Sequence, residues 1–340
     1  MKLAIDCREI RKGVTTGLSR VLTSFIKATD KKKIDSLLIV DRNVDVERLR
    51  NIKPDSKLIF IPYSNYFLDQ IILPFYIRSS DVFFSIYPKF PLLFRGKIYI
   101  TVADLIGYSK VKRCFVSNAS KRVECIFTLS DYWKKEIGKI TKSKVLRVTP
   151  DISYLPKLKR KKEKDGILYV GNFNPHKNLK NLLIGYKLAT EEVNYEIPKL
   201  ILCGGGGRYS EDIGPLIREL GLDSYISLRI KPPDSEVFKL YSSCLFFIFP
   251  STDEGFGLPP LEASFYGAAV AVSDIPVFRE SFSDKALFFD PYDPEDIKRK
   301  IIDMTHKVEL REMISRGCRE IALSFASKNV GEEILSFILS

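Results

Sequence analysis

The segment FPSTDEGFGLPPLE, residues 249–262, carries the pattern from which the fold and the function of this chain can be predicted. The apolar run that leads into it, LFFIFPS at 245–251, has the composition of a buried strand. Gly255 and Gly257 follow, and at glycines the backbone can approach a ligand closely. Two prolines then open a helix, because proline is tolerated in a first helical turn. The segment predicts a strand, a tight loop and a helix N-terminus, which together suit an anionic or hydroxyl-rich ligand.

Glu254 and Glu262 lie eight positions apart, one before the helix and one in its expected first turn. A carboxylate can accept hydrogen bonds from two neighbouring hydroxyls of a pyranose or a ribose. A simpler explanation exists for Glu262, because the helix dipole alone favours an acidic residue in a first turn. The spacing and the glycines favour the first interpretation, in which both carboxylates line one cleft.

Strand and helix patterns alternate along the whole chain of 340 residues, which is longer than one hydrophobic core usually serves. In the first half, strands are expected at 2–6, 36–40, 57–61, 82–86 and 97–102, with a helix at 16–28. In the second half, the alternating segments are 167–171, 178–189, 199–204, 210–222 (a helix interrupted at Pro215), 226–230, 236–244, 245–251, 258–267, 268–273, 286–289 and 294–304. This alternation predicts an α/β protein with two Rossmann-like units and mainly parallel sheets. The polar segment PKLKRKKEKDG, residues 156–166, predicts an exposed linker between them.

The formal charge of +12 is concentrated in the first half: residues 1–150 sum to +15, residues 151–170 to +3 and residues 171–340 to −6. A basic face can serve nucleic acid, anionic lipid or a phosphorylated substrate, or only solubility. Aromatic residues crowd one apolar region of this half, where they indicate core packing or a surface for a membrane or an acceptor. They are Tyr63, Tyr66, Phe67, Phe75 and Tyr76.

The six cysteines lie far apart without a C-x-x-C pair, and the only histidines are His176 and His306. This pattern argues against a metal site and for reduced core thiols in a cytosolic protein. No apolar run approaches the ~18 residues of a membrane-spanning helix, and the start of the chain has no secretory signal. A cytoplasmic protein is expected.

The segment EGFGLPPLE resembles the E-x7-E motif of retaining GT-B glycosyltransferases, a family that uses nucleotide sugars and includes bacterial mannosyl-, glucosyl- and rhamnosyltransferases of surface-polysaccharide assembly. Other segments resemble the family in the same order, over nearly the whole chain. They are Asp6 to Arg8, Thr16 to Arg20, Thr128 to Ile137, Tyr169 to Leu183 and Ala286 to Ile297.

The resemblance implies a GT-B fold, with two Rossmann-like domains whose parallel sheets face a central cleft. An acceptor-binding domain would cover 1–155, a linker 156–166 and a nucleotide-sugar domain 167–325. The C-terminal helix, 326–340, would pack back on the first domain. The implied activity is hexosyl transfer (mannose, glucose or a rhamnose-like sugar) from a nucleoside-diphosphate sugar to a saccharide or lipid-linked acceptor in lipopolysaccharide or related assembly.

The resemblance also implies roles for single residues. Glu254 would contact hydroxyls of the transferred sugar, Glu262 the nucleotide ribose, and Lys177 would neutralise the leaving diphosphate. Backbone amides of Phe256, Gly257 and Leu258 would face the sugar and phosphates, and Ile230 and Lys231 fall where the family holds the base. The remaining donor-binding candidates are Gly17, Asp104, Gly171, Asn172, Arg208 and Gly255.

Two positions depart from the family pattern. Ala103 stands where many relatives have a histidine that touches the donor sugar, and Asn172 stands where many have an arginine. Lys177 then has less help in neutralising the diphosphate, and Arg208 is a candidate to compensate. Arg208 follows four glycines, 204–207, which indicate either a phosphate cradle or, lacking the P-loop lysine, a flexible turn.

No metal and no cofactor are expected, because positive side chains and helix N-termini can stabilise a leaving diphosphate without a metal, and no D-x-D motif is evident. The family implies retention, with the leaving phosphate deprotonating the acceptor. The basic first half indicates an anionic or membrane-held acceptor, such as a polyprenyl diphosphate-linked glycan at the inner face of the plasma membrane. A non-catalytic nucleotide-sugar-binding protein and a sugar-nucleotide epimerase of the same fold stay open as alternatives, whereas no nucleic-acid-binding motif occurs.

Overall fold

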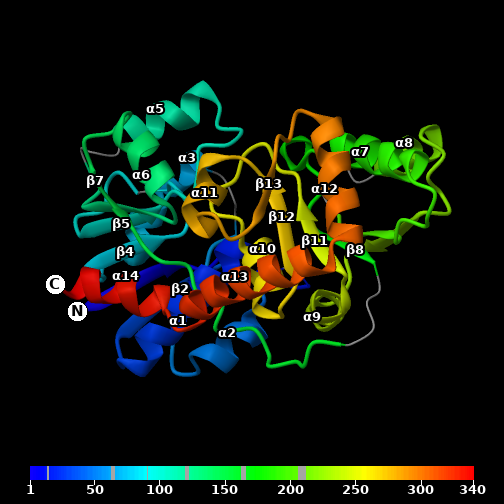
Figure 1. Cartoon of the computed structure of the whole chain (residues 1–340). Helices are drawn as coiled ribbons and strands as arrows, with labels where there is room; N and C mark the ends of the chain where they lie inside the picture. The colour runs from blue at the N-terminus through cyan, green and yellow to red at the C-terminus, as the bar shows by residue number, and fades with distance from the viewer. Residues whose placement is uncertain (14, 63–65, 90, 119–121, 162–165, 206–211) are drawn as a thin grey trace. The chain divides into compact units, whose positions relative to one another are not determined.

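A computed structural model of the chain describes residues 1–13, 15–62, 66–89, 91–118, 122–161, 166–205 and 212–340, with the backbone alone at 66, 67, 111 and 115. The chain forms two compact units. Unit 1 consists of Met1–Asp151 and Lys328–Ser340, and unit 2 consists of Ile152–Ser327. Both chain ends therefore lie in unit 1, where they are labelled close together in Figure 1.

Unit 1 is built on a parallel sheet of seven strands in the order β3-β2-β1-β4-β5-β6-β7. The strands are β1 (Lys2–Asp6), β2 (Asp35–Val40), β3 (Lys57–Phe60), β4 (Val82–Ser85), β5 (Lys97–Thr101), β6 (Cys125–Thr128) and β7 (Lys144–Arg147). The helices are α1 (Gly17–Lys31), α2 (Val46–Ile52), α3 (Tyr66–Ile71), α4 (Leu73–Ile77), α5 (Lys110–Asn118), α6 (Asp131–Gly138) and α14 (Val330–Leu339). The strand order reverses between β1 and β4, which opens a crevice beyond the carboxyl ends of these two strands.

Helix α14 closes one side of unit 1 by packing along α1, and Figure 1 shows the two helices side by side. The approach is close, since a Cβ added at Gly331 would lie 2.2 Å from the backbone oxygen of Ser24. Asp151 fixes the start of α14 by accepting hydrogen bonds from the Val330 amide and the Ser24 hydroxyl. Further along, Phe337 packs edge-on against aromatic rings of the sheet. Unit 1 is therefore completed by the last residues of the chain.

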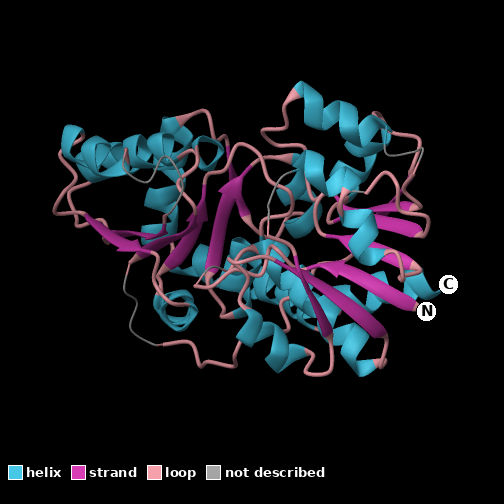
Figure 2. Cartoon of the chain, turned by 180° about the vertical axis from the view of Figure 1, so that it is seen from behind, coloured by secondary structure: helices cyan, strands magenta, loops and turns pink. Residues whose placement is uncertain are grey.

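Unit 2 has a second parallel sheet, with six strands in the order β10-β9-β8-β11-β12-β13. The strands are β8 (Ile167–Gly171), β9 (Leu200–Gly204), β10 (Ile226–Ile230), β11 (Phe246–Phe249), β12 (Ala269–Ser273) and β13 (Leu287–Phe289). The helices are α7 (Leu179–Glu192), α8 (Ile213–Glu219), α9 (Asp234–Ser243), α10 (Leu258–Phe265), α11 (Pro276–Phe282), α12 (Pro294–His306) and α13 (Val308–Ala326). Helices lie on both sides of each sheet (Figure 2). The order reverses between β8 and β11, so unit 2 has a crevice equivalent to that of unit 1.

The α/β fold with two parallel sheets is confirmed, but several local expectations were wrong. Strands β6 and β7 were not predicted. β7 is an edge strand whose two charged ends leave only two apolar residues between them. Pro215 does not interrupt a helix: α8 begins at Ile213, so the proline lies in the first turn, where its missing amide hydrogen costs nothing. Cys114 is exposed, whereas the other five cysteines are buried as expected.

The expected linker, 156–166, is partly tied down. The Arg160 guanidinium donates hydrogen bonds to the backbone oxygens of Tyr241 and Cys244, and the Lys161 amide donates to Ser242. Residues 162–165 lie outside the described residues. The described part of this polar segment belongs to unit 2.

Candidate functional site

The loops that follow β8 and β11 converge at the crevice of unit 2. The loop after β8 contains a short 3₁₀ helix, Pro175–Lys177, and the loop after β11 leads into α10. The Thr252 amide donates a hydrogen bond of 2.8 Å to the backbone oxygen of His176, and the Asn178 side chain donates to the backbone oxygen of Pro250. These bonds bring Lys177 and Glu254 together, although they are 77 residues apart in sequence.

Lys177 and Glu254 form an ion pair inside unit 2, in which the Lys177 ammonium donates a hydrogen bond to Glu254 Oε1. The side chains are only 11% and 9% exposed. The ammonium also lies 5.2 Å from the centre of the Phe249 ring, a cation–π distance. The two residues predicted to be catalytic are thus in contact, and their charges are held at the ends of the two central strands.

Glu262 has separate partners. The Tyr241 hydroxyl donates to its Oε2 at 2.8 Å, and the Tyr154 hydroxyl donates to its Oε1. Burial raises the pKa of Tyr241, and the neighbouring Glu262 carboxylate raises it further, so this hydroxyl stays protonated and can donate. Neither tyrosine was predicted, because nothing in the local sequence distinguishes it from a core tyrosine.

The start of α10 corrects the sequence interpretation of Glu262. The helix begins at Leu258, so Glu262 is its fifth residue and lies beyond the first turn. The helix dipole acts mainly within the first turn and therefore does not explain an acidic residue here. Gly257 precedes the helix with φ of +84°, and a side chain there would lie 2.4 Å from the Phe278 ring. Only glycine fits this turn.

Three further glycines form a backbone surface beside the ion pair. A Cβ at Gly171 would lie 2.6 Å from the Tyr169 hydroxyl, and one at Gly204 would lie 2.0 Å from the Gly171 backbone oxygen. Gly205, with φ of +85°, lies between Phe173 and Ile230. Ile230 is 51% exposed at the end of β10 and therefore offers an apolar surface to a ligand.

The other donor-binding candidates are placed as follows. Lys231 follows Ile230 in the left-handed region and donates its amide to the Gly204 oxygen. Asn172 is exposed, and Gly255 and Leu258 are buried. Phe256 is buried, and its ring lies edge-on to Phe325. Arg208, Gly206 and Gly207 lie outside the described residues.

Gly17 and Asp104 belong to unit 1 rather than to this crevice. Gly17 is the first residue of α1, which Thr16 and Ser19 cap reciprocally. Asp104 accepts a hydrogen bond from the Ile106 amide after β5, one residue beyond Ala103. Both stay predictions as donor ligands.

The pKa values of Asp253 and His176, the sequence neighbours of Glu254 and Lys177, are shifted from their usual values. Burial raises the pKa of Asp253, and the Glu254 carboxylate adds to this effect. Burial lowers the pKa of His176, and the Lys177 ammonium lowers it further. His176 is therefore neutral at pH 7, so Lys177 is the cation that this loop offers to an anionic ligand.

Among the described residues, no three His, Cys, Asp or Glu side chains gather in a group that could hold a metal ion. The described helices are all too short or too polar to cross a membrane.

The sequence of this chain is similar to those of known glycosyltransferases. Residues 152–320 match the family described as "Glycosyl transferases group 1". The O-antigen chain mannosyltransferase RfbU of Salmonella typhimurium is 28% identical over 309 residues, which cover 87% of this chain and 83% of that protein. The O-antigen chain mannosyltransferase B of Escherichia coli is 32% identical over 162 residues, 48% of this chain and 42% of that protein.

The fold of this chain is also similar to the folds of solved protein structures. Anabaena Alr3699/HepE in complex with UDP and glucose has a TM-score of 0.81, with 14% identity, and the match covers 100% of this chain and 99% of that one. Its likeness confirms the predicted GT-B fold. Through residues 152–320, the chain belongs to the Glycosyl transferases group 1 family.

Proposed function

We propose that this glycosyltransferase is a retaining, metal-independent hexosyltransferase. It transfers a sugar from a nucleoside diphosphate to a saccharide or lipid-linked acceptor in the assembly of a surface polysaccharide. Among the hexoses expected from the sequence, mannose is the leading donor sugar, because both curated relatives named above are mannosyltransferases. Glucose and rhamnose-like sugars follow.

The Lys177–Glu254 ion pair is the observation that supports this proposal most directly. Departure of a nucleoside diphosphate builds negative charge on the leaving phosphate, and a preorganised cation stabilises that charge without reorganisation. An ammonium has three donors, so Lys177 can keep its bond to Glu254 while donating to phosphate oxygens. Glu254 can in turn accept hydrogen bonds from sugar hydroxyls. The pair therefore links recognition of the sugar to neutralisation of the leaving group.

The neighbouring groups fit the rest of the donor. Glu262, held by Tyr241 and Tyr154, is the proposed ribose acceptor. The backbone at Gly171 and Gly204 has no side chains to obstruct the diphosphate, and Ile230 would face the base. Because Glu254 is paired with Lys177, we propose that the departing phosphate accepts the proton of the acceptor hydroxyl. This mechanism corresponds to retention of the configuration at the transferred sugar.

We further propose peripheral attachment to an anionic membrane at the inner face of the plasma membrane, where a polyprenyl diphosphate-linked acceptor would be presented. Counting Lys and Arg against Asp and Glu, unit 1 carries +13 and unit 2 carries −1, which together give the +12 of the chain. Each basic residue near such a surface contributes about 1 kcal/mol of attraction. Unit 1 also exposes large apolar side chains around α3 and α4: Phe60, Leu68, Ile71, Phe75 and Tyr76.

The test is turnover by the purified protein of GDP-mannose, compared with UDP- and dTDP-hexoses, with and without EDTA. We expect release of nucleoside diphosphate and of an α-linked sugar, unaffected by EDTA and lost in Glu254→Gln. Binding without turnover, or interconversion of the sugar without transfer, would instead identify a binding protein or an epimerase. Co-sedimentation with phosphatidylglycerol vesicles at low salt tests the membrane proposal, and failure to sediment would reject it.

A further inference from the structure

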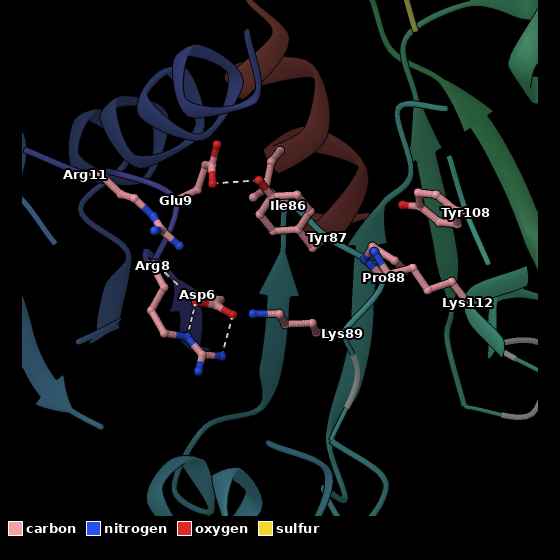
Figure 3. A pocket seen from close by; sticks show the side chains of 10 residues that line it. All are labelled: Asp6, Arg8, Glu9, Arg11, Ile86, Tyr87, Pro88, Lys89, Tyr108 and Lys112. Atoms are coloured by element: carbon pink, nitrogen blue, oxygen red, sulfur yellow. Dashed lines mark hydrogen bonds and ion pairs between the residues drawn. The ribbon is translucent and has the colours of Figure 1, made fainter. Parts of the chain in front are cut away.

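The crevice of unit 1 contains a cavity of about 280 Å³ beyond the carboxyl ends of β1 and β4. Figure 3 shows the side chains that line it. The strand order reverses at this point, where ligands bind in open parallel sheets. Its walls come from the loops after β1 and β4 and from the segment that includes the start of α5. None of the donor-binding residues proposed above lines it, so it is a separate candidate site.

The floor of the cavity is a buried charge cluster. Arg8 donates to both oxygens of Asp6 at 2.8 Å and to both oxygens of Asp69 at 2.8 and 2.9 Å. Lys89 lies 3.8 Å from Asp69, and Figure 3 shows its side chain pointing toward Asp6. Two cations and two carboxylates thus balance, and four of the five N–H donors of the Arg8 guanidinium bind these carboxylates. The cluster makes a rigid polar floor.

Two tyrosines, Tyr87 and Tyr108, form an aromatic wall of the cavity, and a hydrogen bond to Glu9 holds Tyr87 in place. The Tyr87 hydroxyl donates to Glu9 Oε2 at 2.6 Å (Figure 3). The Thr16 hydroxyl donates to Glu9 Oε1 at 2.7 Å. A second ring, Tyr108, lines the cavity from the segment after β5. Both rings are half-buried. Aromatic rings held in place next to carboxylate oxygens suit a saccharide, since the rings cover its C–H faces and the oxygens accept from its hydroxyls.

The rim adds positive charge that the protein does not balance. Arg11 and Lys112 line the cavity and are exposed. Across the described part of the chain, no carboxylate lies within ion-pair distance of either. The Lys112 ammonium lies 5.4 Å from the centre of the Tyr108 ring, which places a cation next to the aromatic wall. The cavity is therefore a polar, aromatic site with two cations available to an anion.

We infer that this cavity binds an anionic saccharide: one sugar ring that carries a phosphate or a carboxylate, with either Arg11 or Lys112 on the charged group. The volume lies just below the range of about 300–1,000 Å³ for small-molecule sites, so it suits one such unit and is too small for an oligosaccharide. This inference rests on the proposed function, because it names the class of acceptor that a glycosyltransferase with this site would use.

Calorimetric titration with hexose 1-phosphate, hexuronate, the neutral methyl hexoside and inorganic phosphate tests the inference. The experiment uses Lys177→Met/Glu254→Gln, in which the cation of the unit 2 crevice is removed. We expect the hexose phosphate or the hexuronate to bind, and the tighter of the two identifies the charged group. Equal binding of the neutral hexoside, or of inorganic phosphate alone, would overturn the inference.

Variants locate the binding. Either Arg11→Ala or Lys112→Ala should weaken it about tenfold, the size expected for a charge-assisted hydrogen bond at a partly exposed site, and the variant that does so identifies the cation on the charged group. Unchanged affinity in both variants would reject the site. Lys135→Ala removes the same charge from the exposed side of α6 and should leave affinity unchanged. Equal loss in Lys135→Ala would mean nonspecific attraction and would reject the site. Because no donor is present, the titration is independent of transferase activity: a chain that binds the anionic sugar but turns over no nucleotide sugar refutes the proposed function alone.

Discussion

Removing one charge of the Lys177–Glu254 pair should lower both the melting temperature and the rate of sugar transfer. A double variant without either charge should distinguish the two effects. Lys177→Met leaves the Glu254 carboxylate, 9% exposed, without its ammonium, and Glu254→Gln does the reverse. Breaking a buried ion pair from one side costs about 3–5 kcal/mol. For a unit of this size, a loss of about 3 kcal/mol lowers the melting temperature by roughly 6–12 °C.

The double variant Lys177→Met/Glu254→Gln removes both charges and keeps similar side-chain volumes. Replacing a buried ion pair by neutral groups is often close to neutral for stability, so its melting temperature should return to within about 3 °C of the wild type. Activity should not return, because the cation that stabilises the leaving phosphate is absent, and losses of about 100-fold or more are typical for such a group.

The assays are scanning calorimetry and release of nucleoside diphosphate, and the matched control is Lys180→Met at an exposed position of α7. The reasoning about stability is refuted if Lys177→Met melts like Lys180→Met. The proposed role in catalysis is refuted if the double variant turns over donor within tenfold of the wild-type rate.

Three further predictions follow from other contacts. Tyr241→Phe removes the hydroxyl that donates to Glu262 and should raise the KM for the nucleotide sugar with little change in kcat; a 2′-deoxyribose donor should show a smaller difference between variant and wild type. Burial alone would raise the pKa of Asp6, but hydrogen bonds from Arg8 outweigh it and hold this pKa below its usual value. The resulting stabilisation is complete above about pH 4 and is lost as pH falls through the lowered pKa, so urea denaturation should show a steeper acid decline in the wild type than in Asp6→Asn. Ellman's reagent should modify Cys114 first among the six thiols, and Cys114→Ser should abolish this rapid phase.

The sequence predicted those parts of the site whose signal is local. The pattern of a strand, a glycine loop and a helix start lies within 14 residues and includes both glutamates. In the structure, Glu254 lies in the loop after β11 and Glu262 lies on α10. The helix start was misjudged because Gly257, with positive φ, is the N-cap, so that α10 begins at Leu258 and not at the two prolines that follow it. Glu262 therefore lies beyond the first turn of α10, where the helix dipole does not explain an acidic residue.

Contacts between distant segments could not be predicted. Tyr154 and Tyr241 meet Glu262 from 108 and 21 residues away, and a tyrosine that caps a carboxylate has the same local sequence context as one in a core. The unit 1 cavity was missed for the same reason. The sequence interpretation noted Asp6 and Arg8 only as a motif, and Asp69, which completes their cluster, lies 61 residues beyond Arg8.

The position of α14 has a consequence for how the protein is made. Unit 1 is formed by two segments, Met1–Asp151 and Lys328–Ser340, and all of unit 2 lies between them in the sequence. Until α14 is synthesised, the face of α1 that Gly331 contacts has no cover. A nascent chain therefore carries an incomplete unit 1 throughout synthesis of unit 2. Truncation within residues 328–340 would leave the proposed donor site of unit 2 intact in sequence while exposing the apolar surface of α1 that α14 covers in unit 1.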